Sequence, residues 1–263
     1  MDQLFRGLHE IRELNFSNRI VAWLTQRDNI SFEIYAKFKE ITFYASIHPY
    51  YAEILEKQIT SYYATVSIDY VKPPLLEPED KKIKNFIKSY YLYLKNDNAY
   101  PIKTFKTIEN DPLNDLTNVL SKLEENEKAT IQMMIRPLDD KWRKVAADVG
   151  TAIFKGKKVS KGFNIPGLRL LGWFFTAVIQ SPEAADKSFA PGASSGDSYV
   201  RMLQTEEDLA KRVGEKSQQV GFESVIRILA SSDKGESRCD TILNGIFVAF
   251  NSIKEADANW FQA

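Results

Sequence analysis

The chain has little of the chemistry on which many protein classes depend. Of its 263 residues one is cysteine and two are histidine, and 35 Lys and Arg balance 35 Asp and Glu. A lone Cys239 excludes a disulfide framework and a cysteine-rich zinc module. His9 and His48 are too few and too far apart for a histidine-based metal centre. The zero net charge argues against a dedicated nucleic-acid-binding protein, because such proteins usually carry a basic excess.

Long hydrophobic runs and targeting segments are also missing. The most apolar stretch has about a dozen residues, fewer than the ~20 that a membrane-spanning helix needs. No N-terminal segment joins a basic start to an apolar core and a cleavage site. With 44% hydrophobic and 27% charged residues, the composition is that of a globular protein. We therefore expect a cytoplasmic protein without a signal peptide.

The spacing of apolar residues in the first part of the chain changes between the period of about 2 typical of strands and the period of about 3.6 typical of helices. Residues 30–38 and 41–47 alternate apolar with polar side chains, which predicts a hairpin of two half-buried strands. Pro49 then begins a helix with an apolar stripe that reaches Tyr62. Residues 66–70 predict a third strand, so this unit is strand–strand–helix–strand.

A second unit follows the prolines between residues 73 and 78. Asp111–Pro112 predicts a helix start, because Asp caps the helix and Pro occupies its first position. The apolar run from Phe222 predicts a central strand covered on both faces. Asp233 and Glu236 have the spacing of a capping box before the last helix. The strands are expected at 86–94, 102–108, 129–135 and 222–230, and the helices at 111–123, 142–153, from 205 onward, and from the Asp233 cap to Phe250.

These patterns predict an α+β fold. Strand, short polar turn and amphipathic helix follow one another three times, which favours a mixed or antiparallel sheet with helices packed on it. We expect two ferredoxin-like halves, residues 1–78 and 79–263. Residues 156–203 are rich in Ser, Ala, Gly and Pro toward their end and are predicted to be a long mobile loop inserted in the second half.

No constellation of residues predicts catalysis. The stretch from Gly156 to Gly162 does not match a phosphate-binding loop, which needs Gly-Lys-Ser/Thr after four spacer residues. Cys239 lies on the apolar face of a predicted helix, as a structural thiol does. The carboxylate clusters fall in turns or at helix starts, where the helix dipole favours them. We expect no enzymatic activity, no cofactor and no metal site in this chain.

Two sets of residues are candidates for binding. A lysine cluster followed by a short apolar stretch could lie on an anionic membrane surface, on a partner, or on the protein's own core. This set comprises Lys157, Lys158, Lys161, Leu171, Trp173, Phe174 and Phe175. The second set could bind single-stranded nucleic acid by stacking and charge, although tyrosines more often fill half-buried strand faces. It comprises Lys84, Lys88, Tyr91 and Tyr93.

Several segments together resemble a known family by their order and spacing. They are residues 30–34, 41–59 with His48–Pro49, 100–105, 111–123, 127–142 and 221–232 with the last helix. They resemble the domain that precedes the motor in conjugative, type IV secretion-like ATPases of small-genome bacteria. In longer relatives this domain lies between transmembrane helices and a P-loop domain. This chain has neither, and no catalytic residue is carried over.

The resemblance implies a function in assembly. We expect a non-catalytic, membrane-proximal domain of a DNA-transfer ATPase at the cytoplasmic face of the membrane. Its partners would be a downstream or separate P-loop ATPase, further copies of the chain and the membrane surface. The alternative is a single-stranded nucleic-acid-binding module that uses the tyrosines and the lysine cluster.

Overall fold

The computed structural model describes residues 2–10, 29–63, 65–72, 85–104, 106–108, 111–155 and 204–263. The strands are β1 (Ile30–Lys37), β2 (Glu40–Ile47), β3 (Phe86–Leu94), β4 (Lys128–Pro137), β5 (Phe222–Ser232) and β6 (Phe261–Gln262). The helices are α1 (Asp2–His9), α3 (Pro49–Tyr62), α4 (Pro112–Leu120), α5 (Lys141–Phe154), α7 (Gln204–Ser217), α8 (Glu236–Ala249) and the 3-10 helix η3 (Phe250–Ile253). The predicted α+β class is confirmed.

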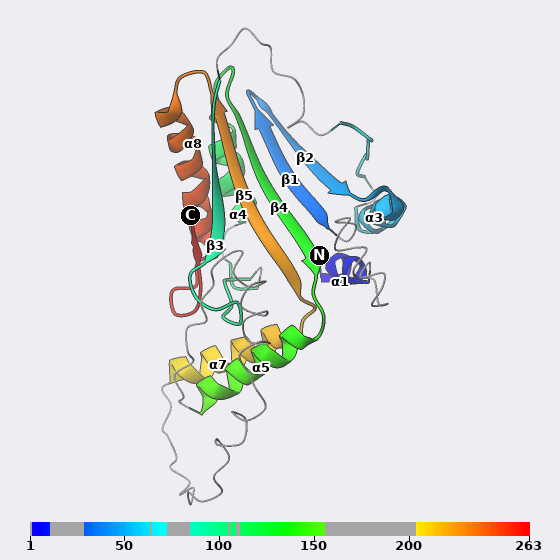
Figure 1. Cartoon of the computed structure of the whole chain (residues 1–263), viewed down its shortest axis with the longest axis vertical. Coiled ribbons are helices and arrows are strands. Elements are labelled where there is room, and N and C mark those ends of the chain that lie inside the picture. The colour runs from blue at the N-terminus through cyan, green and yellow to red at the C-terminus, as the bar shows by residue number, and fades with distance from the viewer. Residues whose placement is uncertain are drawn as a thin grey trace, which may run out of the picture.

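All six strands form one antiparallel sheet in the order β2-β1-β4-β5-β3-β6 (Figure 1). The hairpin β1–β2 forms as predicted, and Lys39, with φ of 60°, makes its tight turn. Ile34 pairs with both Phe43 on β2 and Ile131 on β4, so apolar residues of neighbouring strands share a face. This register therefore places the alternating apolar side chains of neighbouring strands on the same side of the sheet.

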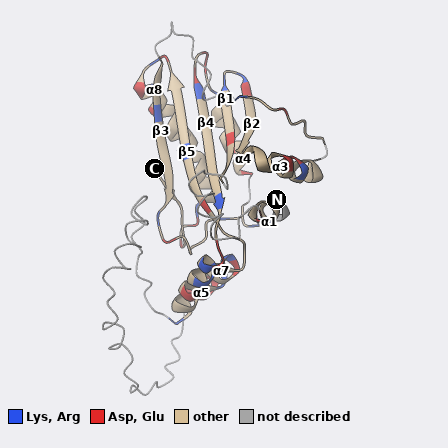
Figure 2. Cartoon of the chain, turned by 45° about the vertical axis from the view of Figure 1, so that its right-hand side comes forward, with Lys and Arg blue, Asp and Glu red and all other residues tan. Residues whose placement is uncertain are grey.

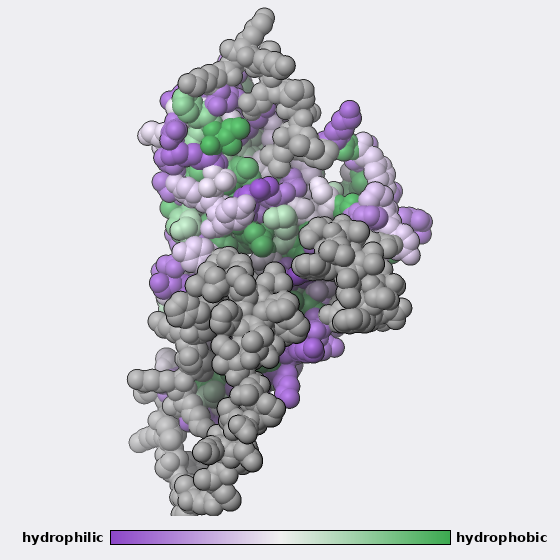
Figure 3. Space-filling view, viewed as in Figure 1, coloured by the Kyte–Doolittle hydropathy of each residue, from purple (hydrophilic) through white to green (hydrophobic). Residues whose placement is uncertain are grey.

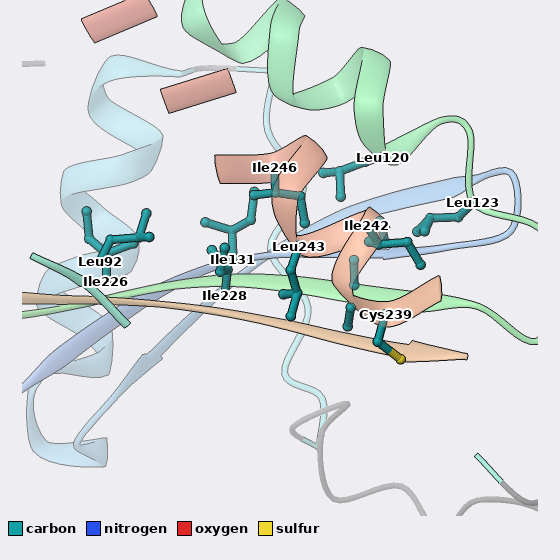
Figure 4. Packing of buried hydrophobic residues seen from close by; sticks show 13 residues of the cluster. Leu92, Leu120, Leu123, Ile131, Ile226, Ile228, Cys239, Ile242, Leu243 and Ile246 are labelled. Carbon is teal, nitrogen blue, oxygen red and sulfur yellow. The ribbon is translucent and has the colours of Figure 1, made fainter. Parts of the chain in front are cut away.

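Helices α4 and α8 cover that side (Figure 1). Leu243 and Ile246 of α8 have no exposed surface, and they meet Ile228 of β5 in the main core (Figure 4). Burying one such side chain stabilises the fold by about 1.5–3 kcal/mol. β5 is central in the sheet, as predicted, but its predicted coverage on the second face holds only in part, because there Ser231 is 7% exposed whereas Val225 is 41% exposed.

Two smaller clusters extend the structure at one end of the sheet. Leu8 of α1 and Leu55 of α3 pack with Ile30 at the end of the hairpin. Helices α5 and α7 pack against each other around Val213. The predicted loop 156–203, between these two helices, lies outside the described residues. A Cβ at Gly221 would lie 2.1 Å from Trp142 Nε1, so a larger residue here would force the Trp142 ring to move.

Two predicted strands do not form. Residues 66–70 carry no strand, because their apolar side chains find no buried face: Val66 is 45% and Tyr70 77% exposed. Residues 102–104 and 106–108 also carry none. There the chain turns, since Thr107 N–H donates to Thr104 O at 2.8 Å, and Lys103 N–H donates to Ile253 O rather than to a strand.

Helix starts follow the local chemistry in two of three places. Asp111 caps α4 by accepting from Leu113 N–H at 3.0 Å, as predicted. His48 Nδ1 accepts from Tyr50 N–H at 3.2 Å and caps α3. At α8 the predicted Asp233 cap is wrong, because Gly235, with φ of 107°, occupies that position. Glycine is the residue that most readily adopts this backbone geometry.

Candidate interaction surface

The sheet face opposite α4 and α8 carries a polar network at its centre. Gln132 Nε2–H donates to Glu33 Oε1 at 2.8 Å, and Arg227 Nη2–H donates to Gln132 Oε1 at 2.5 Å. Ser31 Oγ–H adds a third hydrogen bond to Glu33 at 2.9 Å. Glu33 is 6% and Gln132 8% exposed. Because this network joins β1, β4 and β5, it favours a single register of the three strands.

An apolar patch lies beside this network, on β3 and β5. Ile87, Tyr91, Tyr93 and Val225, here called the β3–β5 patch, are 62%, 54%, 45% and 41% exposed. The register pairs Tyr91 with Arg227, so a guanidinium borders the aromatic rings. Figure 3 shows apolar patches in green among hydrophilic residues over the strands. Exposed aromatic and aliphatic side chains gathered on one surface are typical of sites that bind another molecule.

Charged residues on this face are mostly neutralised by neighbours. Arg136 on β4 forms an ion pair with Glu223 on β5, and Lys37 pairs with Glu40 at 3.0 Å across the hairpin turn. Charge is sparse along the strands and denser on α3, α5 and α7 (Figure 2). The open face is therefore amphipathic rather than strongly basic.

The structure separates the residues predicted to bind nucleic acid. Tyr91 and Tyr93 lie together in the β3–β5 patch, whereas Lys88 lies on the helix-covered side of β3. There Lys88 Nζ is 2.8 Å from Asp240 and 3.3 Å from Glu236 of α8, and the hydrogen bond to Asp240 raises the pKa of Lys88. Lys84 lies outside the described residues, as does the whole predicted membrane set between Lys157 and Phe175.

Sequence reasoning missed a second feature, a hollow of ≈ 570 Å³ beside the outer edge of β3. Its walls come from β3, α8, η3 and β6, and its main lining residues are Tyr90, Asn244, Phe247, Lys254, Trp260 and Phe261. The Lys254 ammonium lies 5.1 Å from the centre of the Trp260 ring, a cation–π distance. The aromatic pair at 260–261 was the available signal, but nothing local indicates that α8 and β3 meet it.

Comparison with known proteins places the chain in a family. A family model described as a domain of unknown function, DUF8128, matches residues 1–257. The chain belongs to the DUF8128 family. No curated protein and no solved structure matches it significantly.

The described part of this DUF8128 chain offers no group of three or more His, Cys, Asp or Glu side chains that could hold a metal ion. Burial raises the pKa of the Cys239 thiol, which donates to Phe86 O at 3.3 Å. His9 Nε2 is 2.9 Å from Leu138 O. Among the helices described, none has the length and apolar character needed to cross a bilayer. In the described part of the chain, the surfaces best suited to bind another molecule are the β3–β5 patch and the hollow.

Proposed function

We propose that this domain is a non-catalytic assembly module that binds another polypeptide through the open face of its sheet. The observation that carries the proposal is the β3–β5 patch, whose large apolar side chains are about half exposed on a face without helices in the described chain. Aromatic residues are enriched at protein interfaces because they bury much area at low entropic cost.

The proposed partner comes from the resemblance of the sequence to the domain that precedes the motor in type IV secretion-like ATPases. We propose that the module belongs to a DNA-transfer ATPase assembly at the cytoplasmic face of the membrane, where it holds the P-loop motor or further copies of itself. The ion pair of Arg136 with Glu223, two residues before Val225 on β5, neutralises charge beside the patch, which fits a protein partner because protein interfaces are depleted in charged residues at their centre.

The test is binding of the full chain to the P-loop ATPase encoded in the same genome. Isothermal titration should give saturable binding, and the double substitution Tyr91→Ala with Tyr93→Ala should weaken it at least about tenfold, as expected for interface anchors. Phe154→Ala, at the end of α5 and 61% exposed, is the matched control and should change little. A strictly monomeric chain that binds neither the ATPase nor anionic liposomes would contradict the proposal.

A second candidate is a module that binds single-stranded nucleic acid. Tyr91 and Tyr93 are exposed on a sheet face and Arg227 pairs with Tyr91, an arrangement suited to base stacking. Gel retardation at low salt should then be lost with Tyr91→Ala and weakened by Arg227→Gln, while Lys88→Ala should have little effect because Asp240 and Glu236 already neutralise Lys88. No retardation at low salt would end this alternative.

A further inference from the structure

The outer edge of β3 is mostly unpaired in the described chain. β6 pairs with Tyr93 and Leu94, and no described strand lies beside Ile87–Leu92. This edge carries one charged residue, Lys88, which is held by Asp240 and Glu236. Natural sheets usually protect long edges with charges, prolines or bulges. On this six-residue edge the one such charge, Lys88, is turned toward α8 and neutralised there, and the edge has no proline, so its backbone is suited to accept another strand.

The backbone groups of this edge point outward at alternate residues. Lys95 N–H donates to Trp260 O at 2.9 Å, which shows that residue 95 directs its backbone toward β6. In an antiparallel ladder these directions alternate, so Ile87, Ser89 and Tyr91 direct their N–H and C=O groups to the same outer side. A strand continuing in line with β6 and antiparallel to β3 would meet all of them.

The hollow lies where such a strand would place a side chain. Side chains opposite Tyr90 and Lys88 would fall on the helix-covered side, and Tyr90 itself lines the hollow together with Phe247 of α8 and Trp260. The Asn244 side-chain amide has no hydrogen-bond partner among the described residues, and no described carboxylate pairs with Lys254. The hollow therefore offers aromatic surface, the side-chain amides of Asn244, Asn251 and Gln262, and one cation.

The other side of the same strand would meet the β3–β5 patch. Positions opposite Ile87, Ser89 and Tyr91 fall on the open face, where Ile87 and Tyr91 are 62% and 54% exposed. Directly opposed apolar and aromatic side chains stabilise an antiparallel pair by about 0.2–1 kcal/mol each. Apolar residues at these positions of an added strand would cover surface that the described chain leaves in water.

We propose that the β3 edge binds an extended peptide of a partner protein by strand addition, antiparallel to β3 and in line with β6. The peptide carries apolar side chains toward Ile87 and Tyr91, and on its other side an apolar residue and a carboxylate that enter the hollow near Lys254. This proposal rests on the proposed assembly function and names the surface and the kind of segment that the partner contributes.

The experiment selects random nine-residue displayed peptides on the immobilised full chain and measures the winners by fluorescence anisotropy. Selected peptides should alternate apolar residues and carry a carboxylate. Ile87→Lys should weaken their binding at least about tenfold because it charges the edge, and Lys254→Ala about fivefold. Val145→Lys, on α5 and exposed to the same degree as Ile87, is the matched control and should leave binding within about twofold.

N-methylated peptides separate strand addition from simple hydrophobic contact. Methylation of the peptide nitrogens that face β3 should abolish binding, and methylation of the alternate nitrogens should leave it within about threefold, because only every second N–H joins the ladder. Equal effects at both sets, or no peptide that binds more tightly than about 100 µM, would overturn the proposal.

A second copy of the chain is the rival occupant. Ser89→Cys places an accessible thiol at the middle of the edge, while the natural Cys239 is buried. Disulfide-linked dimers of this variant without peptide would show that the edge pairs with itself and would refute the peptide proposal. If no peptide binds while the ATPase still binds, the strand-addition proposal is wrong and the proposed assembly function stands. If peptides bind and the ATPase does not, the ATPase is not the partner.

Discussion

The same strands form both faces of the sheet, but the two faces differ in how deeply their apolar side chains are buried. On the face toward α4 and α8, Ile228 and Leu243 have no exposed surface and belong to the main core. On the open face, β5 presents Val225, 41% exposed, next to Arg227 and its hydrogen bond to Gln132. Since side chains alternate along a strand, each strand contributes to both faces.

This difference separates stability from recognition. The covered face loses most when a side chain is shortened, because a cavity forms in a close-packed core. The open face keeps exposed apolar residues whose loss should barely affect folding, so their chemistry is available for a partner. The substitutions below test this division from the largest expected effect to the smallest.

The largest contrast should appear within β5 itself. Ile228→Ala should lower the free energy of unfolding by about 3 kcal/mol, as core truncations do. Val225→Ala, three residues earlier on the open face, should lower it by no more than about 0.5 kcal/mol. Urea denaturation followed by circular dichroism measures both. Similar losses for the two variants would show that the open face is also part of the core.

A buried ion pair anchors the covered side and should rank second. Glu127 is 1% exposed and accepts from Arg238 Nε–H at 2.7 Å and Nη2–H at 2.9 Å. Arg238→Ala leaves a buried carboxylate without its partner and should cost about 2 kcal/mol. The conservative Arg238→Lys should recover part of this loss.

The same pair predicts a pH dependence. The hydrogen bond from Arg238 holds the pKa of Glu127 below its ordinary value of 4.5. A depressed pKa in the folded state adds stability above the unfolded pKa and loses it as pH falls through the folded pKa. The difference between the natural protein and Arg238→Ala should be full above pH 4.5 and shrink in acid. A difference independent of pH would exclude this charge pair as its cause.

The polar network of the open face should rank third. Gln132→Leu removes one donor to Glu33 and the acceptor of Arg227, and should cost about 1 kcal/mol. Thr42→Val removes an exposed hydroxyl with a 3.3 Å contact to Glu40 and serves as the control, with a change below about 0.5 kcal/mol. Thermal unfolding measures both. A loss as large as that of Ile228→Ala would remove the contrast between the faces.

Lys216, outside both faces, should give the smallest effect near neutral pH. Its ammonium donates to Asn98 O at 2.6 Å and to Tyr100 O at 3.1 Å, and burial lowers its pKa to about 8. Because the unfolded chain binds this proton more tightly, stability should rise relative to Lys216→Met as pH increases from 8 toward 10.5. Between pH 7 and 8.5 the gain should stay below about 1 kcal/mol. A falling trend would contradict the lowered pKa.

Much of the fold was predictable because its signals are local. The strand 86–94 forms at the predicted residues, and helices α3, α4, α5 and α8 lie where apolar periodicity placed them. The failures at 66–70 and 102–108 have a common cause: apolar alternation predicts a strand only when a neighbouring strand or helix is available to cover it. At 66–70 the side chains remain exposed.

The candidate site was predictable in part. Tyr91 and Tyr93 share a face because they are two residues apart on one strand, and this spacing can be read from the sequence. Lys88, an odd number of residues from both, must lie on the opposite face once the strand is assigned. The hollow could not be predicted, because Tyr90, Phe247 and Trp260 are far apart in sequence and meet only through the packing of α8 and β6 on β3.

The sequence by itself determined the α+β class, most element positions and the side of each strand on which a residue lies, because hydrophobic period and capping act over a few residues. Only the tertiary structure decided the strand order, the coverage of one face by helices, and the exposure of Tyr91, Tyr93 and Val225 on the other face. These features depend on which distant segments pack together, and the pattern of apolar and polar residues within one segment does not identify the segment that packs against it.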